Sequence, residues 1–552
     1  MLDGPSGQER SAMSPRTPML RMVQRTVTEY MVAERLGIPV DEVRAPIFDR
    51  RTLLKAGVGA AVFAGLAGRQ PAVAQSLGPD TPRIAIIGAG IAGLNAALTL
   101  ADAGIAATVY EARGRVGGRM FSEREYWDGG QVSEYGGEGV DSDHHTIRNL
   151  CSRFGIPLVD TLSAAPAGSS PVLYFDGGYV PRDKFIADFE PVFRALQVDA
   201  AACPATPTWN SATPAGIALS TMSLTEWIAT RVPGGYSNWI ARLFDDAYVV
   251  EYGMPTADQT ALNLVSMMKT QKSLDDPRAW GNSDEQYKIS GGSQRLPRAI
   301  AEALPDGAIR YEWRLEAIVR DSDGGQTLIF DDAGTRRTVR ADHTILAVPV
   351  GVLKHIDYSA AGFDPRMTGV IDALPMSTST KLNMQFTSRP WVGRGQWPGV
   401  SNGASFTDVG YQAIWDATAG QPGKQGIAIQ YGGGLDARGF APPSAFPTAA
   451  DLAVRTRVGT VLAQFERVVP GIGTLWNGRA TLSAWHADPL ANGAYSAMPT
   501  NYSHRFFGYE GARQGNIHFA GEHTSSESQG YMNGGAESGA RAAREILSDL
   551  GR

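Results

Sequence analysis

Three closely spaced glycines and an acidic residue could together bind a dinucleotide. Gly88, Gly90 and Gly93 follow the apolar run of residues 84–87, and a longer apolar stretch comes next. In such a strand–turn–helix unit the first glycine permits the tight turn, the second admits a pyrophosphate, and the third lets the helix pack closely. Glu111 ends the next predicted strand, about 20 residues further on, where a carboxylate can accept a ribose hydroxyl group. The spacing therefore predicts a dinucleotide site.

A second pair of glycines, flanked by arginines, narrows the choice of dinucleotide. Residues 113–119 read Arg-Gly-Arg-Val-Gly-Gly-Arg. The glycine pair permits close backbone passage beside the same ligand, and the arginines supply positive charge for phosphate or flavin carbonyl groups. A nicotinamide dehydrogenase needs no such segment at this place, so the pattern favours a flavin dinucleotide.

The run Glu-Ala-x-x-Arg-x-Gly-Gly-Arg at residues 111–119 resembles the flavin amine oxidase family, which includes monoamine, polyamine and L-amino acid oxidases. Residues 520–524 and 530–540 resemble the last flavin segment of that family. The resemblance covers roughly residues 80–552. It implies an enzyme that takes hydride from the carbon beside the nitrogen of a primary amine or L-amino acid. The products would be an imine, then an aldehyde or 2-oxo acid, with ammonia and hydrogen peroxide.

The resemblance implies FAD as the cofactor and assigns residues to its binding. These residues are Gly88, Gly90, Gly93, Glu111, Ala112, Arg113, Gly118, Arg119, Gly137, Glu138, Leu315, Gly521, Glu522, Tyr531 and Met532. Leu315 is expected beside the adenine, and a helix beginning near Met532 would stabilise negative charge on the flavin. Monoamine oxidases have, at the place of Ala494, a cysteine that bonds to the flavin, so FAD is expected to bind here without a covalent bond.

Four residues are implied at the reacting centre. Tyr495 and Tyr531 match the family's aromatic cage, whose desolvated rings favour a neutral amine. Lys381 stands where the family holds a water against flavin N5, and Trp485 is expected to form a pocket wall. Without the resemblance, such aromatic residues are also typical of a protein core, and an isolated lysine is typical of a solvated surface.

The substrate stays open at this stage. L-amino acid oxidases have an arginine that binds the substrate carboxylate at a place that falls here near Gly139. Either another residue binds a carboxylate or the substrate is a simple amine, and Glu138 and Glu251 would suit a distal ammonium if they face the cavity. Two other classes are also open: a flavin-dependent desaturase or porphyrinogen-type oxidase, and a flavin-binding protein without turnover.

The elements that position these residues predict an α/β fold. We expect a discontinuous, Rossmann-like FAD-binding domain and an α+β substrate domain with a helical insertion. The FAD-binding segments are placed at 80–150, 286–352 and 496–552, and the substrate segments at 151–285 and 353–495.

Residues 1–79 form a predicted N-terminal extension. Arg50 and Arg51 precede a mild apolar stretch, and Ala72-Val-Ala74 resembles a cleavage site. This resembles the twin-arginine export signal of bacterial proteins and predicts a periplasmic or secreted protein, or a cytoplasmic one if the leader is retained. The segment before the arginine pair is long for a leader, and residues 16–36 could form an amphipathic helix instead.

Composition limits the partners. The net charge of −6 argues against nucleic acid or an anionic membrane, and the apolar stretch near the N-terminus is too short to span a bilayer comfortably. The two cysteines, Cys151 and Cys203, lack any metal-binding spacing, so no metal site is predicted. The expected partners are a small-molecule amine or amino acid and O2, and a homo-oligomer is possible.

Overall fold

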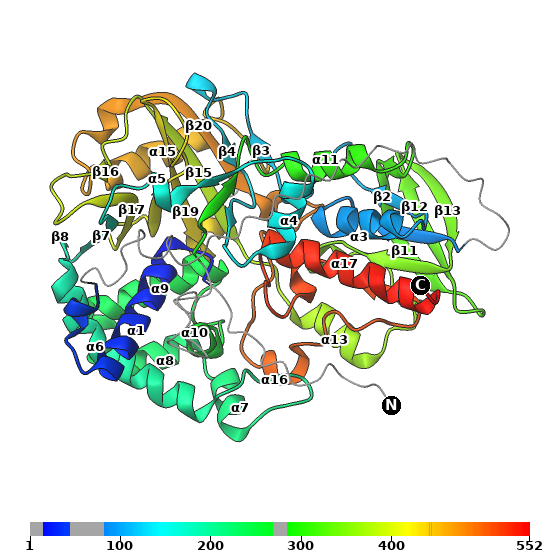
Figure 1. Ribbon diagram of the computed structural model, residues 1–552, viewed down its shortest axis with the longest axis horizontal. Coiled ribbons are helices and arrows are strands. Elements are labelled where there is room, and N and C mark those ends of the chain that lie inside the picture. The colour runs from blue at the N-terminus through cyan, green and yellow to red at the C-terminus, as the bar shows by residue number, and fades with distance from the viewer. Residues whose placement is uncertain (1–14, 45–81, 269–283, 441, 443) are drawn as a thin grey trace, which may run out of the picture.

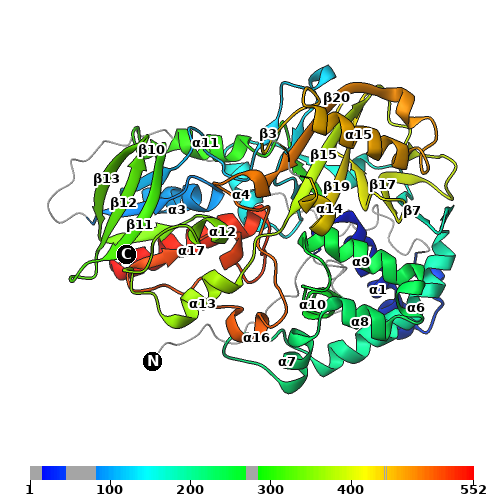
Figure 2. The same cartoon turned by 180° about the vertical axis from the view of Figure 1, so that it is seen from behind.

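The computed structural model describes residues 15–44, 82–268, 284–440, 442 and 444–552. Two lobes lie side by side in Figures 1 and 2. One holds a parallel sheet with long helices, and the other holds a large antiparallel sheet with a helical layer. The expectation of an α/β fold, with a discontinuous domain built on a parallel sheet beside an α+β lobe, is confirmed.

The first lobe is built on a five-stranded parallel sheet. Its strands, in spatial order, are β10 (Ile309–Tyr311), β2 (Thr108–Glu111), β1 (Ile84–Ile87), β14 (His343–Leu346) and β21 (Ile517–Phe519). The central strand β1 is wholly apolar and buried, as expected for a parallel strand covered on both faces. The sheet thus unites strands from three separated parts of the chain.

Helices cover one face of this sheet and a small antiparallel sheet covers the other. On the helical face, α3 (Ile91–Asp102) packs against the last helix, α17 (Met532–Asp549). On the opposite face lies a three-stranded sheet of β11 (Trp313–Arg320), β12 (Gln326–Asp332) and β13 (Thr335–Ala341). The two layers do not cover the carboxyl ends of the parallel strands. The glycine-rich turn follows the carboxyl end of β1, at this edge of the sheet.

The second lobe contains an eight-stranded sheet. Its strands are β20 (Trp476–Ala484), β15 (Ser379–Phe386), β19 (Gly426–Gly433), β18 (Ala413–Asp416), β17 (Ser401–Thr407), β7 (Ser170–Phe175) and β8 (Gly178–Tyr179), with β16 (Val392–Gly393) beside β17. Beneath it lies a helical layer that comprises α6 (Arg182–Ala202), α7 (Pro214–Thr221), α8 (Leu224–Arg231), α9 (Trp239–Tyr252) and α10 (Leu262–Met268). This layer is the helical insertion that the sequence predicts.

The N-terminal helix α1 (Pro18–Leu36) belongs to this helical layer. Thr17 caps its start, and Gly37 ends it in the left-handed conformation. Its apolar face, which includes Leu20, is buried in one core with α6, α9 and α10. Residues 15–44 are therefore part of the second lobe, which corrects the expectation of a separate extension over 1–79 for this stretch.

The predicted arginine pair and cleavage site lie outside the described residues. Within the described part of the chain, no helix has the length and apolar character needed to cross a membrane. Both cysteines, Cys151 and Cys203, are buried free thiols.

Truncating the apolar face of α1 should destabilise the protein. Leu20 is fully buried, so Leu20→Ala leaves a cavity and is expected to lower the free energy of unfolding by about 2–5 kcal/mol. Leu36→Ala, at a position 55% exposed on the same helix, is expected to change it by less than about 0.5 kcal/mol. Urea denaturation followed by circular dichroism measures both. A neutral Leu20→Ala would mean that α1 is not part of the folded core.

Candidate active site

A single cavity of about 1670 Å³ extends from the glycine-rich turn of the first lobe to tyrosines of the second. Of the residues predicted to form the site, only Gly93 is absent from its lining. The predicted residues that line it are Gly88, Gly90, Glu111, Ala112, Arg113, Gly118, Arg119, Gly137, Glu138, Leu315, Lys381, Trp485, Tyr495, Gly521, Glu522, Tyr531 and Met532. The fold therefore gathers into one place residues that are spread over most of the chain.

Each glycine of the turn is required for a different structural reason. Gly88 has φ +102°, and a Cβ there would lie 2.8 Å from the Ala347 carbonyl oxygen. A Cβ on Gly93 would lie 1.9 Å from the Gly88 carbonyl oxygen, so Gly93 packs beneath the turn instead of facing the ligand. A Cβ on Gly90 would meet open space, and no side chain caps the start of α3. The uncapped helix N-terminus beside an open glycine suits a pyrophosphate.

Glu111 holds the turn in place. One carboxylate oxygen accepts a hydrogen bond from the Ala89 N–H at 2.7 Å and the other from the Arg113 N–H at 2.8 Å. Burial raises the pKa of this carboxyl, and these hydrogen bonds oppose the shift. The second glycine pair is fastened to the same turn, because the Gly117 N–H donates to the Ala89 carbonyl at 2.8 Å. The acid predicted to bind a ribose thus positions the backbone of the glycine-rich turn.

Glu522 connects three segments of the wall. Its carboxylate lies 2.9 Å from Arg119 Nη1 and accepts hydrogen bonds from the Ser496 N–H and hydroxyl and from the Gly530 N–H. Burial alone would raise its pKa, but Arg119 and the hydrogen bonds lower it to about 2. Glu522 is therefore ionised, and it fixes the approach of the chain to Tyr531.

Lys381 points from β15 into the same cavity. Its Nζ donates to the Gly136 carbonyl at 2.9 Å and lies 2.7 Å from a carboxylate oxygen of Glu138. The other oxygen of Glu138 lies 2.6 Å from Lys288 Nζ. Burial alone would raise the pKa of Glu138, but the two lysines lower it to about 2. Two ammonium groups share one carboxylate, so this part of the wall is net positive.

The two predicted cage tyrosines both line the cavity. The Tyr495 hydroxyl donates to the Glu251 carbonyl at 2.8 Å and lies 3.2 Å from the Tyr431 hydroxyl. Tyr531 immediately precedes α17, and its ring lies 4.8 Å from that of His144. Burial raises the pKa of Tyr495, so its hydroxyl is neutral. Tyr431 is a third tyrosine of this wall, which the sequence analysis missed because nothing in its local pattern distinguishes it from a core residue.

Trp485 is a fixed part of the wall. Its Nε1 donates to the Tyr135 carbonyl at 2.8 Å, and its ring packs edge-on against Phe446 at 4.7 Å. Trp485 is both a core residue and a pocket wall, the two roles that the sequence allowed. It is buried in a small aromatic cluster and it also lines the cavity.

Arg16 is a site residue that the sequence analysis did not identify. Its guanidinium carbon lies 4.6 Å from the ring centre of Tyr495 and 4.9 Å from that of Tyr252. Its Nε lies 3.2 Å from Glu251 Oε1. Glu251 is fully buried and does not line the cavity, so it offers no free carboxylate to a distal ammonium. More than two hundred residues separate Arg16 from Glu251 along the chain, and no local pattern joins them.

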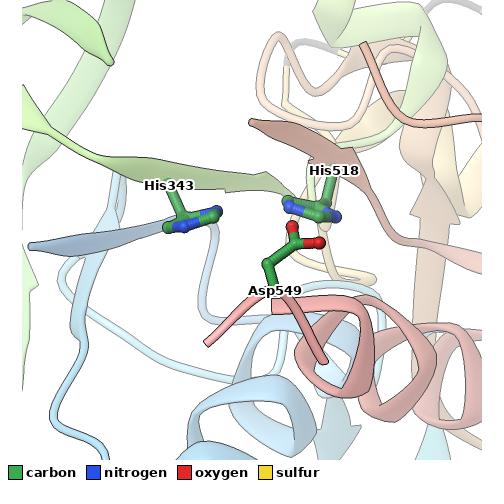
Figure 3. Close-up of side chains that lie close together, drawn as sticks. All are labelled: His343, His518 and Asp549. Atoms are coloured by element: carbon green, nitrogen blue, oxygen red, sulfur yellow. The ribbon is translucent and has the colours of Figure 1, made fainter. Parts of the chain in front are cut away.

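A group of possible metal ligands lies away from this cavity. His343, His518 and Asp549 gather where β14, β21 and the end of α17 meet (Figure 3). None of the three lines the cavity. The group was not predicted, because its members are far apart in the sequence.

Known proteins resemble the chain over most of its length. A family model described as flavin containing amine oxidoreductase matches residues 91–547. An L-amino-acid oxidase of Mus musculus is 24% identical over 85% of this chain and 71% of its own length. A probable flavin-containing monoamine oxidase A of Dictyostelium discoideum is 23% identical over 85% of this chain and 98% of its own length.

Solved structures share the fold. Cyclohexylamine oxidase from Brevibacterium oxydans superposes with a TM-score of 0.69 at 23% identity, over 86% of this chain and 100% of that one. Putrescine oxidase bound to putrescine gives a TM-score of 0.68 at 22% identity, over 85% of this chain and 99% of that one.

Alanine substitutions in the turn should separate folding from cofactor binding. Gly93→Ala forces a clash with backbone and is expected to lower the unfolding free energy by about 1–3 kcal/mol. Gly90→Ala has room in the protein and is expected to keep the stability of the apoprotein. It should weaken FAD binding about tenfold or more, because the methyl group enters the space beside the pyrophosphate. Thermal unfolding and fluorescence titration with FAD measure the two effects. Parental FAD affinity in Gly90→Ala would contradict this placement of the cofactor.

Proposed function

Because the chain belongs to the flavin-containing amine oxidoreductase family, we propose that it is an FAD-dependent oxidase of a primary amine or an L-amino acid. The reaction would give an imine, then an aldehyde or 2-oxo acid, with ammonia and hydrogen peroxide. The observation that carries the proposal is the single cavity in which the glycine-rich turn, Lys381 and two tyrosines face one ligand space.

FAD bound in the cavity supplies the acceptor for hydride from the carbon beside the nitrogen. The protein's part is to orient the amine and keep it neutral. Tyr495 and Tyr531 provide aromatic walls, where a charged ammonium is costly and a free nitrogen lone pair is favoured. The N-terminus of α17, next to Tyr531, would supply positive partial charge to stabilise a reduced, negatively charged flavin in the cavity.

Lys381 is proposed to hold a water beside the flavin and to favour reaction with O2. A fixed cation stabilises negative charge that develops on oxygen. Its contact with Glu138 is shared with Lys288, so the local positive charge is not cancelled. This charged wall and the tyrosine pair favour an amine oxidase over a desaturase or porphyrinogen-type oxidase, whose substrate would be apolar throughout.

Non-covalent binding of FAD is part of the proposal. Ala494 lines the cavity where a tethering cysteine would otherwise stand, and its carbonyl accepts a hydrogen bond from Arg119 at 2.9 Å. Cys151 and Cys203 are buried elsewhere and do not line the cavity.

We also propose export by the twin-arginine route, to the periplasm or the medium, on the basis of Arg50, Arg51 and the segment that follows. Residues 15–44 pack into the second lobe, and cleavage at residues 72–74 would cut them from the rest of the chain. Export with this lobe intact would therefore require that the segment is not cleaved or that it stays bound after cleavage. A cytoplasmic protein is the alternative if the leader is retained.

The purified holoprotein should release hydrogen peroxide with an amine or amino acid. Tyr495→Ala and Tyr531→Ala are each expected to slow reduction of the flavin by about tenfold or more while FAD stays bound, because they open the desolvated wall. Anaerobic stopped-flow spectroscopy measures the reduction rate, and Tyr236→Ala, an exposed tyrosine of the same lobe, serves as the control. Parental rates in both cage variants, or no peroxide from any amine or amino acid, would argue against an amine oxidase.

A further inference from the structure

Arg16 presents hydrogen-bond donors that the protein does not use. Its side chain is only 8% exposed and lines the cavity. Among the described residues, Nη1 has no hydrogen-bond acceptor, and Nε lies 3.2 Å from Glu251 Oε1 without hydrogen-bond alignment. The guanidinium lies against Tyr495, and a Cβ on Gly530 would come within 2.3 Å of Nη1, so it also touches the residue before Tyr531. A buried cation with unused donors at this place indicates an anionic group of the ligand.

Three buried acids near the cavity already have cationic partners. Glu138 contacts two lysines, Glu251 pairs with Arg16, and Glu285 pairs with Arg21 of α1. Because these three carboxylates are already in ion pairs, we do not expect them to bind the second ammonium group of a diamine. Arg16, in contrast, keeps an unused donor at Nη1 beside its ion pair with Glu251, so an anionic group of a ligand could bind there.

The structure also explains why residue 139 is a glycine. A Cβ at Gly139 would lie 2.5 Å from Cδ of Glu285, which Arg21 holds in place. A long side chain at 139 has no room, so an arginine could not reach the cavity from there. Arg21, which holds Glu285 at this position, lies in the first turn of α1, and Arg16 immediately precedes the cap of the same helix.

We propose that Arg16 binds the carboxylate of an α-amino acid substrate, so that the N-terminal segment supplies the anion site of the cavity. The proposal rests on the proposed function, because it names which branch of amine oxidation the protein performs. Guanidinium and carboxylate make charge-assisted, often bidentate hydrogen bonds, which suit a desolvated wall. The amino group of the same substrate would then face the tyrosines.

The test compares matched substrates on the full-chain holoprotein. L-phenylalanine and phenethylamine differ only in the carboxylate, and anaerobic flavin reduction gives an affinity and a limiting rate for each. Arg16→Gln is expected to weaken the affinity for the amino acid by about 10- to 100-fold and to leave that for the amine within about twofold. Arg16→Lys should recover part of the loss, and Arg35→Gln, an exposed arginine at the end of α1, should behave as the parent.

The outcomes separate this proposal from the proposed function. Unchanged amino acid affinity in Arg16→Gln overturns the proposal, and so does faster reduction by both substrates, which would mean that Arg16 blocks the amine site. Oxidation of phenethylamine and other amines but of no amino acid also overturns it, while the proposed function stands. If a broad panel of amines and amino acids fails to reduce the parental flavin, the proposed function itself fails. The FAD content and melting temperature of each variant identify a folding defect. If Arg16→Gln does not fold, the affinity of Arg16→Lys for L-phenylalanine relative to phenethylamine decides between the outcomes.

A second inference rests on the His343, His518 and Asp549 group. One potential ligand atom from each lies within 4.8 Å of the others. His343 Nδ1 and His518 Nε2 are buried, and neither has a hydrogen-bond partner among the described residues. His518 Nδ1 lies 2.7 Å from a carboxylate oxygen of Glu545, which leaves Nε2 as the ligand atom. Figure 3 shows the two imidazoles on neighbouring strands with the Asp549 carboxylate beside them.

We infer that this group binds a divalent cation of the zinc type. Two imidazoles and a carboxylate are ligands that Zn²⁺ uses, and a carboxylate on the far nitrogen of a ligating histidine is its usual support, here Glu545. Asp549 also lies 2.7 Å from Arg513, so the cation would share this carboxylate. The bound ion would connect β14 and β21 to the end of α17, at residues that do not line the cavity.

Calorimetric titration of chelator-treated holoprotein with ZnCl2 tests this site. The parent is expected to bind one ion with micromolar or tighter affinity and to melt at a temperature higher by several degrees. His343→Ala and His518→Ala should each lose both effects, and His504→Ala, which alters a histidine elsewhere, should keep them. Absent binding in the parent, or equal binding in the two site variants, would overturn the inference.

Discussion

Charges buried in the wall of the cavity must be paired, and the rest of the site depends on this constraint. An isolated carboxylate in such a place would be very costly. Three of them pair with a cation from another segment, and Glu111 accepts hydrogen bonds from two backbone N–H groups instead. The ion pairs are Glu522 with Arg119, Glu138 with Lys381, and Glu251 with Arg16. Because each pair joins segments hundreds of residues apart, the wall is complete only when both lobes and the N-terminal helix are folded together.

Such pairs contribute more to position than to stability. Desolvation offsets much of the attraction between buried charges, whereas the loss of one partner leaves the other uncompensated. The pairs therefore hold the tyrosines and the lysine in one geometry at little net gain in unfolding free energy. The large apolar cores of the two lobes, which include residues of β1 and α1, supply the stability on which this geometry rests.

Local patterns predicted the parts of the site that depend on local geometry. The glycine-rich turn, the strand that ends at Glu111 and the helix that starts at Met532 each follow from a few adjacent residues. The placement of Lys381 in the cavity followed from a family resemblance and agrees with the lining of that cavity. Whether these residues act as assigned remains a prediction.

Long-range contacts explain what the sequence could not reveal. Arg16 stands in a stretch whose most obvious motif, the arginine pair further on, resembles an export signal, and its partner Glu251 is distant in the chain. Tyr431 and Tyr252 are ordinary members of a strand and a helix until folding sets them around Tyr495. The role of Glu111 in holding the turn is equally invisible, because it depends on the direction of two backbone N–H groups.

The entry of α1 into the second lobe has an evolutionary consequence. A side chain near the beginning of the chain, at the start of a helix, can be exchanged without disturbing strand register or the glycine-rich turn. If Arg16 binds the substrate, a new substrate specificity could arise from a substitution at this position, while the first lobe with its glycine-rich turn stays unchanged.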